Sequence, residues 1–131
     1  MLTAGAIMTS DIITVRPEAS LEDAIALMLS EEISGLPVID DEGYLVGLIT
    51  EFALLAVAYD QRIKNHTVRD HMTTVLIMVD VNDPISRVAD LCIVHRVRRV
   101  PVMANGRLVG LIARRDVLRA LVESPTAVCS A

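Results

Sequence analysis

The stretch Leu45-Val46-Gly47-Leu48-Ile49 recurs unchanged as Leu108-Val109-Gly110-Leu111-Ile112, 63 residues further along the chain. Two other landmarks precede it in the same order in both copies, each at an offset of 64: Met8-Thr9 matches Met72-Thr73, and Leu36-Pro37-Val38 matches Val100-Pro101-Val102. The offset changes because the turn at residues 40–43 is one residue longer than the turn at 104–106. A fixed order of landmarks with one small gap indicates an internal duplication.

The duplication divides the 131-residue chain into four parts. We predict a first repeat over residues 6–59, a linker over 60–66, a second repeat over 67–123 and an unstructured tail over 124–131. Each repeat has about 55 residues, which is marginal for an independent hydrophobic core. The predicted strands are apolar on both faces, so we expect the two copies to bury their sheets against each other.

Each copy is predicted to have the element order β-α-β-β-α. The β-branched run at 12–15 predicts a short strand. Ser20 is a predicted N-cap for a helix with its apolar face at Leu21, Ala24, Ile25, Met28 and Leu29, and Asp83 is the predicted cap in the second copy, with Pro84 as first helical residue. Strand pairs follow at 36–39 with 45–50 and at 100–103 with 108–113, where Asn105-Gly106 favours a tight hairpin. Final helices are predicted at 52–59 and 115–123.

Composition excludes several classes of protein. An apolar content of 53% and a mean hydropathy of +0.50 argue against disorder. The net charge of −5, with no Trp and one Phe, argues against nucleic-acid binding through a basic face or by base stacking. The longest apolar run, 52–59, is far shorter than the roughly 20 residues of a membrane span. No signal peptide is visible and the two cysteines form no framework, so we expect a cytoplasmic protein without nucleic-acid or membrane partners.

Charge is distributed unevenly between the two copies. Residues 1–66 carry three Lys/Arg and 11 Asp/Glu, a net charge of −8, whereas residues 67–131 carry nine Arg and six Asp/Glu, a net charge of +3. A basic half in an acidic protein indicates an anionic ligand or a complementary partner. Apolar helices such as 52–59 also predict a homodimer, and the charge division favours an antiparallel one as a hypothesis.

The duplicated unit has a Met-Thr entry, an apolar-Pro-Val strand, and a strand containing Gly that leads into a helix. In these features it resembles the CBS (cystathionine-β-synthase) domain pair, or Bateman module, over about Ala6–Leu121. The resemblance implies an α/β (α+β) fold of tandem β-α-β-β-α repeats packed sheet to sheet with pseudo-two-fold symmetry, and a disc-like homodimer. It further implies a regulatory module rather than an enzyme. Such a module requires no cofactor and binds an adenosine-containing ligand (AMP, ADP, ATP, S-adenosylmethionine or NADH) in a cleft between the repeats.

The resemblance also implies where the ligand is held. In the family, the strand-to-helix junction reads Gly-hydrophobic-hydrophobic-Thr/Ser-x-x-Asp, with the carboxylate on the ribose and the helix start facing the phosphate. The first junction keeps Thr50 but has Ala53 in place of the Asp, whereas the second keeps Asp116 but has Ala113 in place of the Thr. The second junction is the better candidate, with Asp116 on the ribose. Four arginines are candidates for the phosphate: Arg98, Arg99, Arg114 and Arg115.

By the same resemblance, the adenine ring is expected near Ile13, Ile33, Ser34, Gly35 and Leu111. Thr50, Ile77 and Val97 would form a second, weaker site, since Glu51 adds negative charge where a phosphate would lie. Plainer interpretations compete with these. Asp116 could satisfy helix N–H groups. Arg98 and Arg99 could be a solvated rim or could pair with acidic residues of the first copy or of a second subunit, and at most one of the adjacent Arg114 and Arg115 is expected to point into the cleft. Thr50 is favoured as an ordinary helix cap over a phosphate ligand.

Two functional hypotheses follow from the sequence. The first is a small-molecule sensor at the second junction. The alternative is a nucleotide-free dimerisation or protein-interaction module that regulates a separate partner. Cys92 and His95 have metal-ligand spacing, but a core thiol and a surface imidazole are favoured. His66 and His71 lie near the linker with no predicted cluster around them, so no catalytic or metal site is expected.

Overall fold

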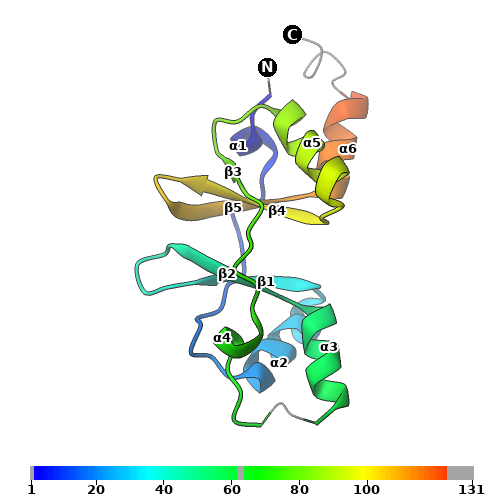
Figure 1. Cartoon of the computed structure of the whole chain (residues 1–131). Helices are drawn as coiled ribbons and strands as arrows, with labels where there is room; N and C mark the ends of the chain where they lie inside the picture. The colour runs from blue at the N-terminus through cyan, green and yellow to red at the C-terminus, as the bar shows by residue number, and fades with distance from the viewer. Residues whose placement is uncertain (1, 62–63, 124–131) are drawn as a thin grey trace. The chain divides into compact units, whose positions relative to one another are not determined.

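The computed structural model describes residues 2–61 and 64–123, which form two compact units (Figure 1). Unit 1 comprises residues 1–12 and 77–131, and unit 2 comprises residues 13–76. Each unit therefore combines the body of one sequence repeat with the opening segment of the other. The predicted mixed helix and strand fold is confirmed. The predicted unstructured tail over 124–131 lies outside the described residues.

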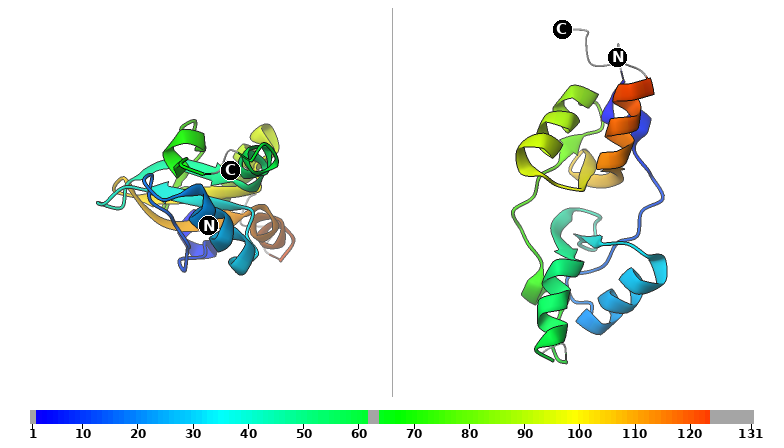
Figure 2. Two further views of the ribbon diagram at one scale, coloured as in Figure 1. Left: turned by 90° about the horizontal axis from the view of Figure 1, so that it is seen from below. Right: turned by 90° about the vertical axis from the view of Figure 1, so that its right-hand side faces the viewer.

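Unit 2 contains α2 (Leu21–Glu31), β1 (Gly35–Ile39), β2 (Leu45–Thr50), α3 (Glu51–Tyr59) and α4 (Val68–His71). β1 and β2 pair antiparallel, with Gly35 opposite Thr50. The helices α2 and α3 lie side by side against one face of this hairpin (Figures 1 and 2), where Leu21, Leu36 and Ile49 are fully buried.

The predicted strand over 12–15 is wrong. Only Val15 forms a bridge, parallel to Val38, through hydrogen bonds to Pro37 O and from Ile39 N. The pairing stops there because Pro17, two residues later, has no N–H to continue the ladder.

Unit 1 contains α1 (Ala4–Ile7), β3 (Val79–Asp80), α5 (Ile85–His95), β4 (Arg99–Ala104), β5 (Arg107–Ala113) and α6 (Arg114–Glu123). Its sheet has the order β3-β4-β5, with β3 parallel and β5 antiparallel to β4. Asn105 and Gly106 both have left-handed φ angles, 53° and 82°, so the predicted tight hairpin is confirmed.

Helix caps follow the sequence in one repeat and not in the other. The Ser20 side chain accepts a hydrogen bond from Asp23 N at 3.0 Å, which confirms Ser20 as the N-cap of α2. In unit 1 the predicted cap is displaced by one residue, because Pro84 is the N-cap of α5. Asp83 instead accepts a hydrogen bond from Asp80 N at 2.8 Å and pairs with Arg87. Its carboxylate closes the turn before the helix, so it is not available to cap α5.

Close packing over a glycine explains why the Met-Thr and Gly-containing landmarks recur together. In unit 2, Thr73 exchanges two backbone hydrogen bonds with Leu48, and a Cβ on Gly47 would lie 2.5 Å from Met72 Sδ. The same arrangement recurs in unit 1, where a Cβ on Gly110 would lie 2.5 Å from Met8 Sδ. A larger residue would require the methionine side chain to move and would crowd a threonine carbonyl at 3.0–3.1 Å. The two landmarks are therefore halves of one packing motif.

Candidate functional site

The strand-to-helix junctions of the two units have the same backbone arrangement. In unit 2, Glu51 N at the start of α3 donates to Ser34 O at 2.9 Å, just before β1. In unit 1, Arg114 N at the start of α6 donates to Arg98 O at 2.7 Å, just before β4. Each junction therefore places two short segments, distant in sequence, side by side.

At the unit 1 junction this arrangement gathers positive charge. The backbone N–H of Arg114 donates a hydrogen bond to the carbonyl oxygen of Arg98. Arg99 lies opposite Ala113 in the pairing of β4 with β5. The side chains of Arg98, Arg114 and Arg115 are exposed, and within residues 2–61 and 64–123 they make no ion pair with a carboxylate. Guanidinium groups without a carboxylate partner form a surface that attracts anions. The structure thus places the backbones of Arg98 and Arg114 side by side, and the roles of the four arginines remain predictions.

Asp116 lies in the first turn of α6, beside this arginine cluster. Its side chain is 27% exposed, and it accepts a hydrogen bond from Arg119 Nη1 at 3.2 Å. Sequence reasoning missed Arg119, although an Asp and an Arg three residues apart on a helix are expected to meet. Arg119 is 57% exposed and is the only side chain that pairs with the Asp116 carboxylate among the described residues. The Asp116 carboxylate can therefore still accept hydrogen bonds from a ligand.

The unit 2 junction carries different chemistry on the same backbone. Thr50 Oγ1 accepts a hydrogen bond from Ala53 N at 3.3 Å, so the interpretation of Thr50 as the N-cap of α3 is confirmed. Ala53, at the position equivalent to Asp116, offers no carboxylate. Glu51 is exposed at the start of α3 and adds a negative charge.

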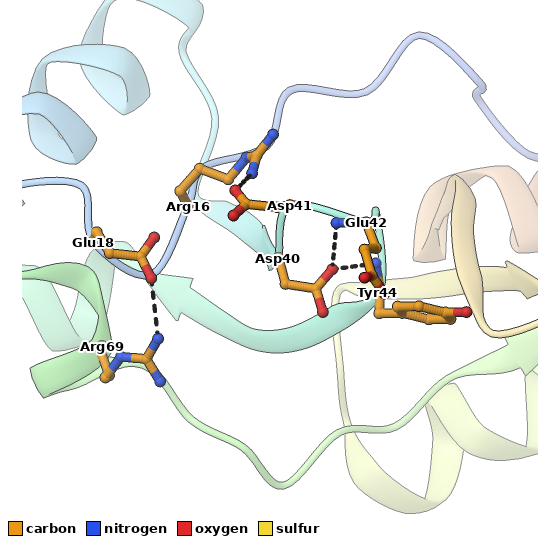
Figure 3. Close-up of polar contacts among 7 residues, drawn as sticks. All are labelled: Arg16, Glu18, Asp40, Asp41, Glu42, Tyr44 and Arg69. Carbon is orange, nitrogen blue, oxygen red and sulfur yellow. Dashed lines mark hydrogen bonds and ion pairs between the residues drawn. The ribbon is translucent and has the colours of Figure 1, made fainter.

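In unit 2, two of the few positively charged side chains form ion pairs with carboxylates at the surface (Figure 3). Arg16 pairs with Asp41, and Arg69 Nη2 lies 3.2 Å from Glu18 Oε1. Unit 2 carries four Lys/Arg against 11 Asp/Glu, a net charge of −7, whereas unit 1 carries eight Arg against six Asp/Glu, a net charge of +2. Unit 1 is therefore the electrostatically favourable unit for an anionic ligand.

The residues proposed to contact adenine are divided between the units. Ile13 and Ile33 are partly buried against the core of unit 2, Ser34 directly precedes β1, and Gly35 is the first residue of β1. Leu111 lies on β5 of unit 1, where its backbone pairs with Thr9. Ile77 and Val97, proposed for the weaker site with Thr50, also belong to unit 1. The roles of these residues remain predictions.

Cys92 and the histidines are the other side chains that could bind a metal or take part in catalysis. Cys92 is buried on α5 and His95 is exposed, which confirms the interpretation as a core thiol and a surface imidazole. Burial raises the pKa of the Cys92 thiol, partly opposed by the charge of Arg114. The rings of His66 and His71 lie in contact, a pairing that the sequence did not indicate. In the described part of the chain, no group of three or more His, Cys, Asp or Glu side chains could hold a metal ion.

Among the described residues, no helix is both long and apolar enough to cross a membrane. The cytoplasmic location remains a prediction.

Comparison with known families gives two matches to the CBS domain, at residues 4–60 and 68–123. The chain is 30% identical to CBSX2, a chloroplastic CBS domain-containing protein of Arabidopsis thaliana, over 92% of this chain and 64% of CBSX2. The crystal structure of CBSX2 in complex with AMP superimposes with a TM-score of 0.84, at 32% identity, over 94% of this chain and 98% of that one.

Two further relatives differ in length. Hypoxic response protein 1 of Mycobacterium tuberculosis is 30% identical over 99% of this chain and 96% of its own length. Its crystal structure, with two coordinated zinc ions, gives a TM-score of 0.80 at 28% identity over 90% of this chain and 98% of that one. Inosine-5′-monophosphate dehydrogenase of Methanocaldococcus jannaschii is 34% identical over 88% of this chain, which spans only 23% of the enzyme. The chain is thus similar both to proteins of its own size and to one segment of a larger enzyme.

Proposed function

Because the chain belongs to the CBS domain family, with two repeats at residues 4–60 and 68–123, we propose that it is a regulatory module for an adenosine-containing ligand. The proposed site is the β5–α6 junction of unit 1. CBSX2, whose structure holds AMP, supports this class of ligand.

A single backbone hydrogen bond favours the unit 1 junction as the ligand site. The Arg98 O to Arg114 N hydrogen bond places two exposed arginines beside the first turn of α6, which carries Asp116. We assign Asp116 to the ribose hydroxyls, because a carboxylate accepts two hydrogen bonds from a vicinal diol. We assign Arg98, Arg99, Arg114 and Arg115 to the phosphate. The equivalent junction of unit 2, with Glu51 and Ala53, offers neither group.

The charge of the site favours phosphorylated ligands. AMP, ADP, ATP and NADH are anions, whereas S-adenosylmethionine carries a positively charged sulfonium. The exposed Arg98, Arg114 and Arg115 at this junction repel a cation and attract an anion. Within the adenosine class, the adenine nucleotides are therefore the leading candidates.

Binding can be tested on purified full-length protein stripped of nucleotide, with a thermal-shift series over AMP, ADP, ATP, NADH and S-adenosylmethionine. A ligand at about 100 times its Kd adds roughly 2.7 kcal/mol of stability, which raises the Tm of a domain this size by several degrees. Asp116→Asn and Arg114→Gln are expected to reduce the shift. Arg87→Gln is the matched control, since it removes a charge from unit 1 away from the junction. A folded protein that responds to none of the five ligands would contradict the proposal.

Exposed apolar side chains favour a second activity, self-association. Phe52 and Tyr59 on α3 are 82% and 85% exposed, and Leu55 lies between them on the same helix. In unit 1, Ile93 and Val94 of α5 and Leu118 and Val122 of α6 are also exposed. Apolar side chains gathered on helices mark surfaces for protein contacts. We therefore propose a homodimer built on these helices, whether or not a nucleotide is bound.

The oligomeric state can be measured by light scattering after size exclusion. We expect a dimer for the wild type and a monomer for the Phe52→Ser/Tyr59→Ser variant. Val75→Ser is the matched control, because Val75 is 83% exposed but lies outside the helices. A wild-type monomer, or equal effects of the variant and the control, would contradict the dimer.

A further inference from the structure

His66 and His71 of unit 2 face each other across a short contact. His66 Nδ1 lies 2.8 Å from His71 Nε2, the ring centroids are 5.1 Å apart, and the ring planes differ by 18°. The centroid separation exceeds the nitrogen separation by 2.3 Å, which is twice the radius of an imidazole ring. The rings therefore meet edge to edge, with the two nitrogens on the line that joins their centres.

This geometry suits a shared proton rather than a chelated metal. Two imidazoles that bind one metal must direct both lone pairs at a third point, about 2.0–2.1 Å from each nitrogen. Here the lone-pair directions oppose each other along one line, as they do in an N–H···N hydrogen bond. The pair is thus joined when one nitrogen carries a proton and the other does not.

The contact tolerates one added proton but not two. In the neutral pair one ring donates and the other accepts. A single added proton goes to a ring nitrogen outside the contact, so one N–H still faces one free lone pair. When both rings are protonated, both facing nitrogens carry hydrogen and the contact is lost.

The contact joins the two ends of a docked segment. His66 precedes α4 and His71 is its last residue. Between them Val68 is fully buried, and its N–H donates to Ala19 O at 2.9 Å, while Arg69 N donates to Pro17 O at 3.0 Å. His66 O also accepts a hydrogen bond from Leu21 N at 3.2 Å. The contact between His66 and His71 therefore links the two ends of the segment 66–71, which packs against the start of α2.

Among residues 2–61 and 64–123, the charged groups beside the pair belong to α4 and to the loop before α2. Asp70, on α4, interacts with both rings, and Arg69 pairs with Glu18 on the loop before α2. The Thr67 backbone N–H holds the pKa of Asp70 below its usual value. This carboxylate therefore stays ionised in mildly acidic solution.

Unit 1 contains the same docked segment without histidines. Ala4 N donates to Asp83 O, Gly5 N to Val81 O, and Ile85 N to Leu2 O, at 2.8, 2.9 and 3.2 Å. These bonds match those of unit 2 residue by residue at an offset of 64. The positions of His66 and His71 are occupied by Leu2 and Ile7, both packed against the unit 1 core. Leu2 and Ile7 therefore allow a direct comparison between an apolar pair and the histidine pair at equivalent positions of the two units.

We infer that the His66–His71 contact is an acid-sensitive latch. It holds α4 on unit 2 near neutral pH and loosens α4 when both rings are protonated. Because α4 opens the second repeat, the latch makes the connection between the repeats responsive to pH. The α1 segment, braced by Leu2 and Ile7, does not respond. This inference is independent of any nucleotide.

Amide hydrogen exchange on the full chain tests the latch at about pH 7.5 and about pH 5, on either side of the range in which histidines titrate. After correction for intrinsic exchange, the protection of Val68 and Arg69 is expected to fall about three- to tenfold at the lower pH, the worth of one hydrogen bond. The protection of Ala4 and Gly5 is expected to stay constant. A nitrogen–nitrogen coupling between His66 Nδ1 and His71 Nε2 should be visible by NMR only at the higher pH.

The His66→Leu/His71→Ile variant copies unit 1 and should remove the acid response of Val68 and Arg69. His95→Gln is the matched control and should leave it unchanged. Equal acid responses of the α4 and α1 amides in the wild type would overturn the inference, and so would an acid response that survives in the double variant. If that variant does not fold, the wild-type comparison of α4 with α1 remains decisive.

Discussion

The two units share a backbone and differ in what they place on it. At each strand-to-helix junction the first N–H of the helix donates to the carbonyl just before the first strand of the hairpin, at 2.9 Å in unit 2 and 2.7 Å in unit 1. The residues that make these bonds are Ser34 and Glu51 in one unit, and Arg98 and Arg114 in the other. Backbone hydrogen bonds do not depend on side-chain identity, so after duplication the side chains could diverge without loss of the fold.

The difference shows which features the fold demands and which remain free. Both units keep a glycine beneath a methionine, where a Cβ would lie 2.5 Å from the methionine sulfur. They differ in the junction charges, in the helix caps and in the residues that brace the docked segment. Substitutions that exchange residues between equivalent positions therefore separate structural requirements from functional ones.

The largest effect is expected at the shared glycines. In Gly47→Ala and Gly110→Ala the new Cβ would lie 2.5 Å from a methionine sulfur and 3.0–3.1 Å from a threonine carbonyl oxygen. Overpacking of this kind costs about 1–3 kcal/mol, and we expect both variants to lose that much in urea unfolding. Gly35→Ala is the control, because its nearest neighbour would be 3.5 Å away. Equal losses in all three variants would show that the methionine packing is not the cause.

The next largest effect is a change in stability that has opposite signs at the two strand-to-helix junctions. Thr50 caps α3 through Ala53 N, whereas Ala113 precedes α6 and has no side-chain acceptor to offer. We expect Thr50→Ala to lose about 1 kcal/mol and Ala113→Thr to gain a similar amount, the usual worth of an N-cap. Thr74→Ala, at an exposed position outside the helices, is the control for loss of a hydroxyl. A loss of stability in Ala113→Thr would mean that the junctions are not structurally equivalent.

Much of this architecture could be predicted from the sequence. The Gly-containing repeats and the Asn105-Gly106 turn gave correct strand pairs, because short apolar runs and turn chemistry act locally. The docking of residues 1–12 with the second repeat could not be predicted, since it depends on long-range pairing such as Thr9 with Leu111. Among candidate site residues, the proximity of Arg98 to Arg114 depends on a backbone bond between segments distant in sequence. The His66–His71 contact was missed because a five-residue spacing matches no regular helix face.

A third, smaller effect depends on pH. The capping box of α4 joins Thr67 and Asp70, and the Thr67 backbone N–H is the main cause of the lowered pKa of Asp70. A carboxylate with a lowered pKa stabilises the folded state above its ordinary pKa and loses that contribution as the pH falls through the folded value. We expect Asp70→Asn to lower the Tm at neutral pH, with the difference vanishing below about pH 3. Asp90→Asn, at an exposed position on α5, should show no such pH dependence.

The smallest effect is expected where α2 and α5 end. Both helices stop at a left-handed residue, Glu32 with φ 55° and Arg96 with φ 54°, so the backbone cost is the same in both. The charges are opposite, and the C-terminal end of a helix favours a cation by about 0.3–1 kcal/mol. Glu32→Arg should therefore stabilise unit 2, and Arg96→Glu should destabilise unit 1 by a similar amount. Both changes should shrink in high salt. If the gain in stability of Glu32→Arg persists at high salt, side-chain packing rather than charge is its cause. The difference between the two helix ends is then not electrostatic alone.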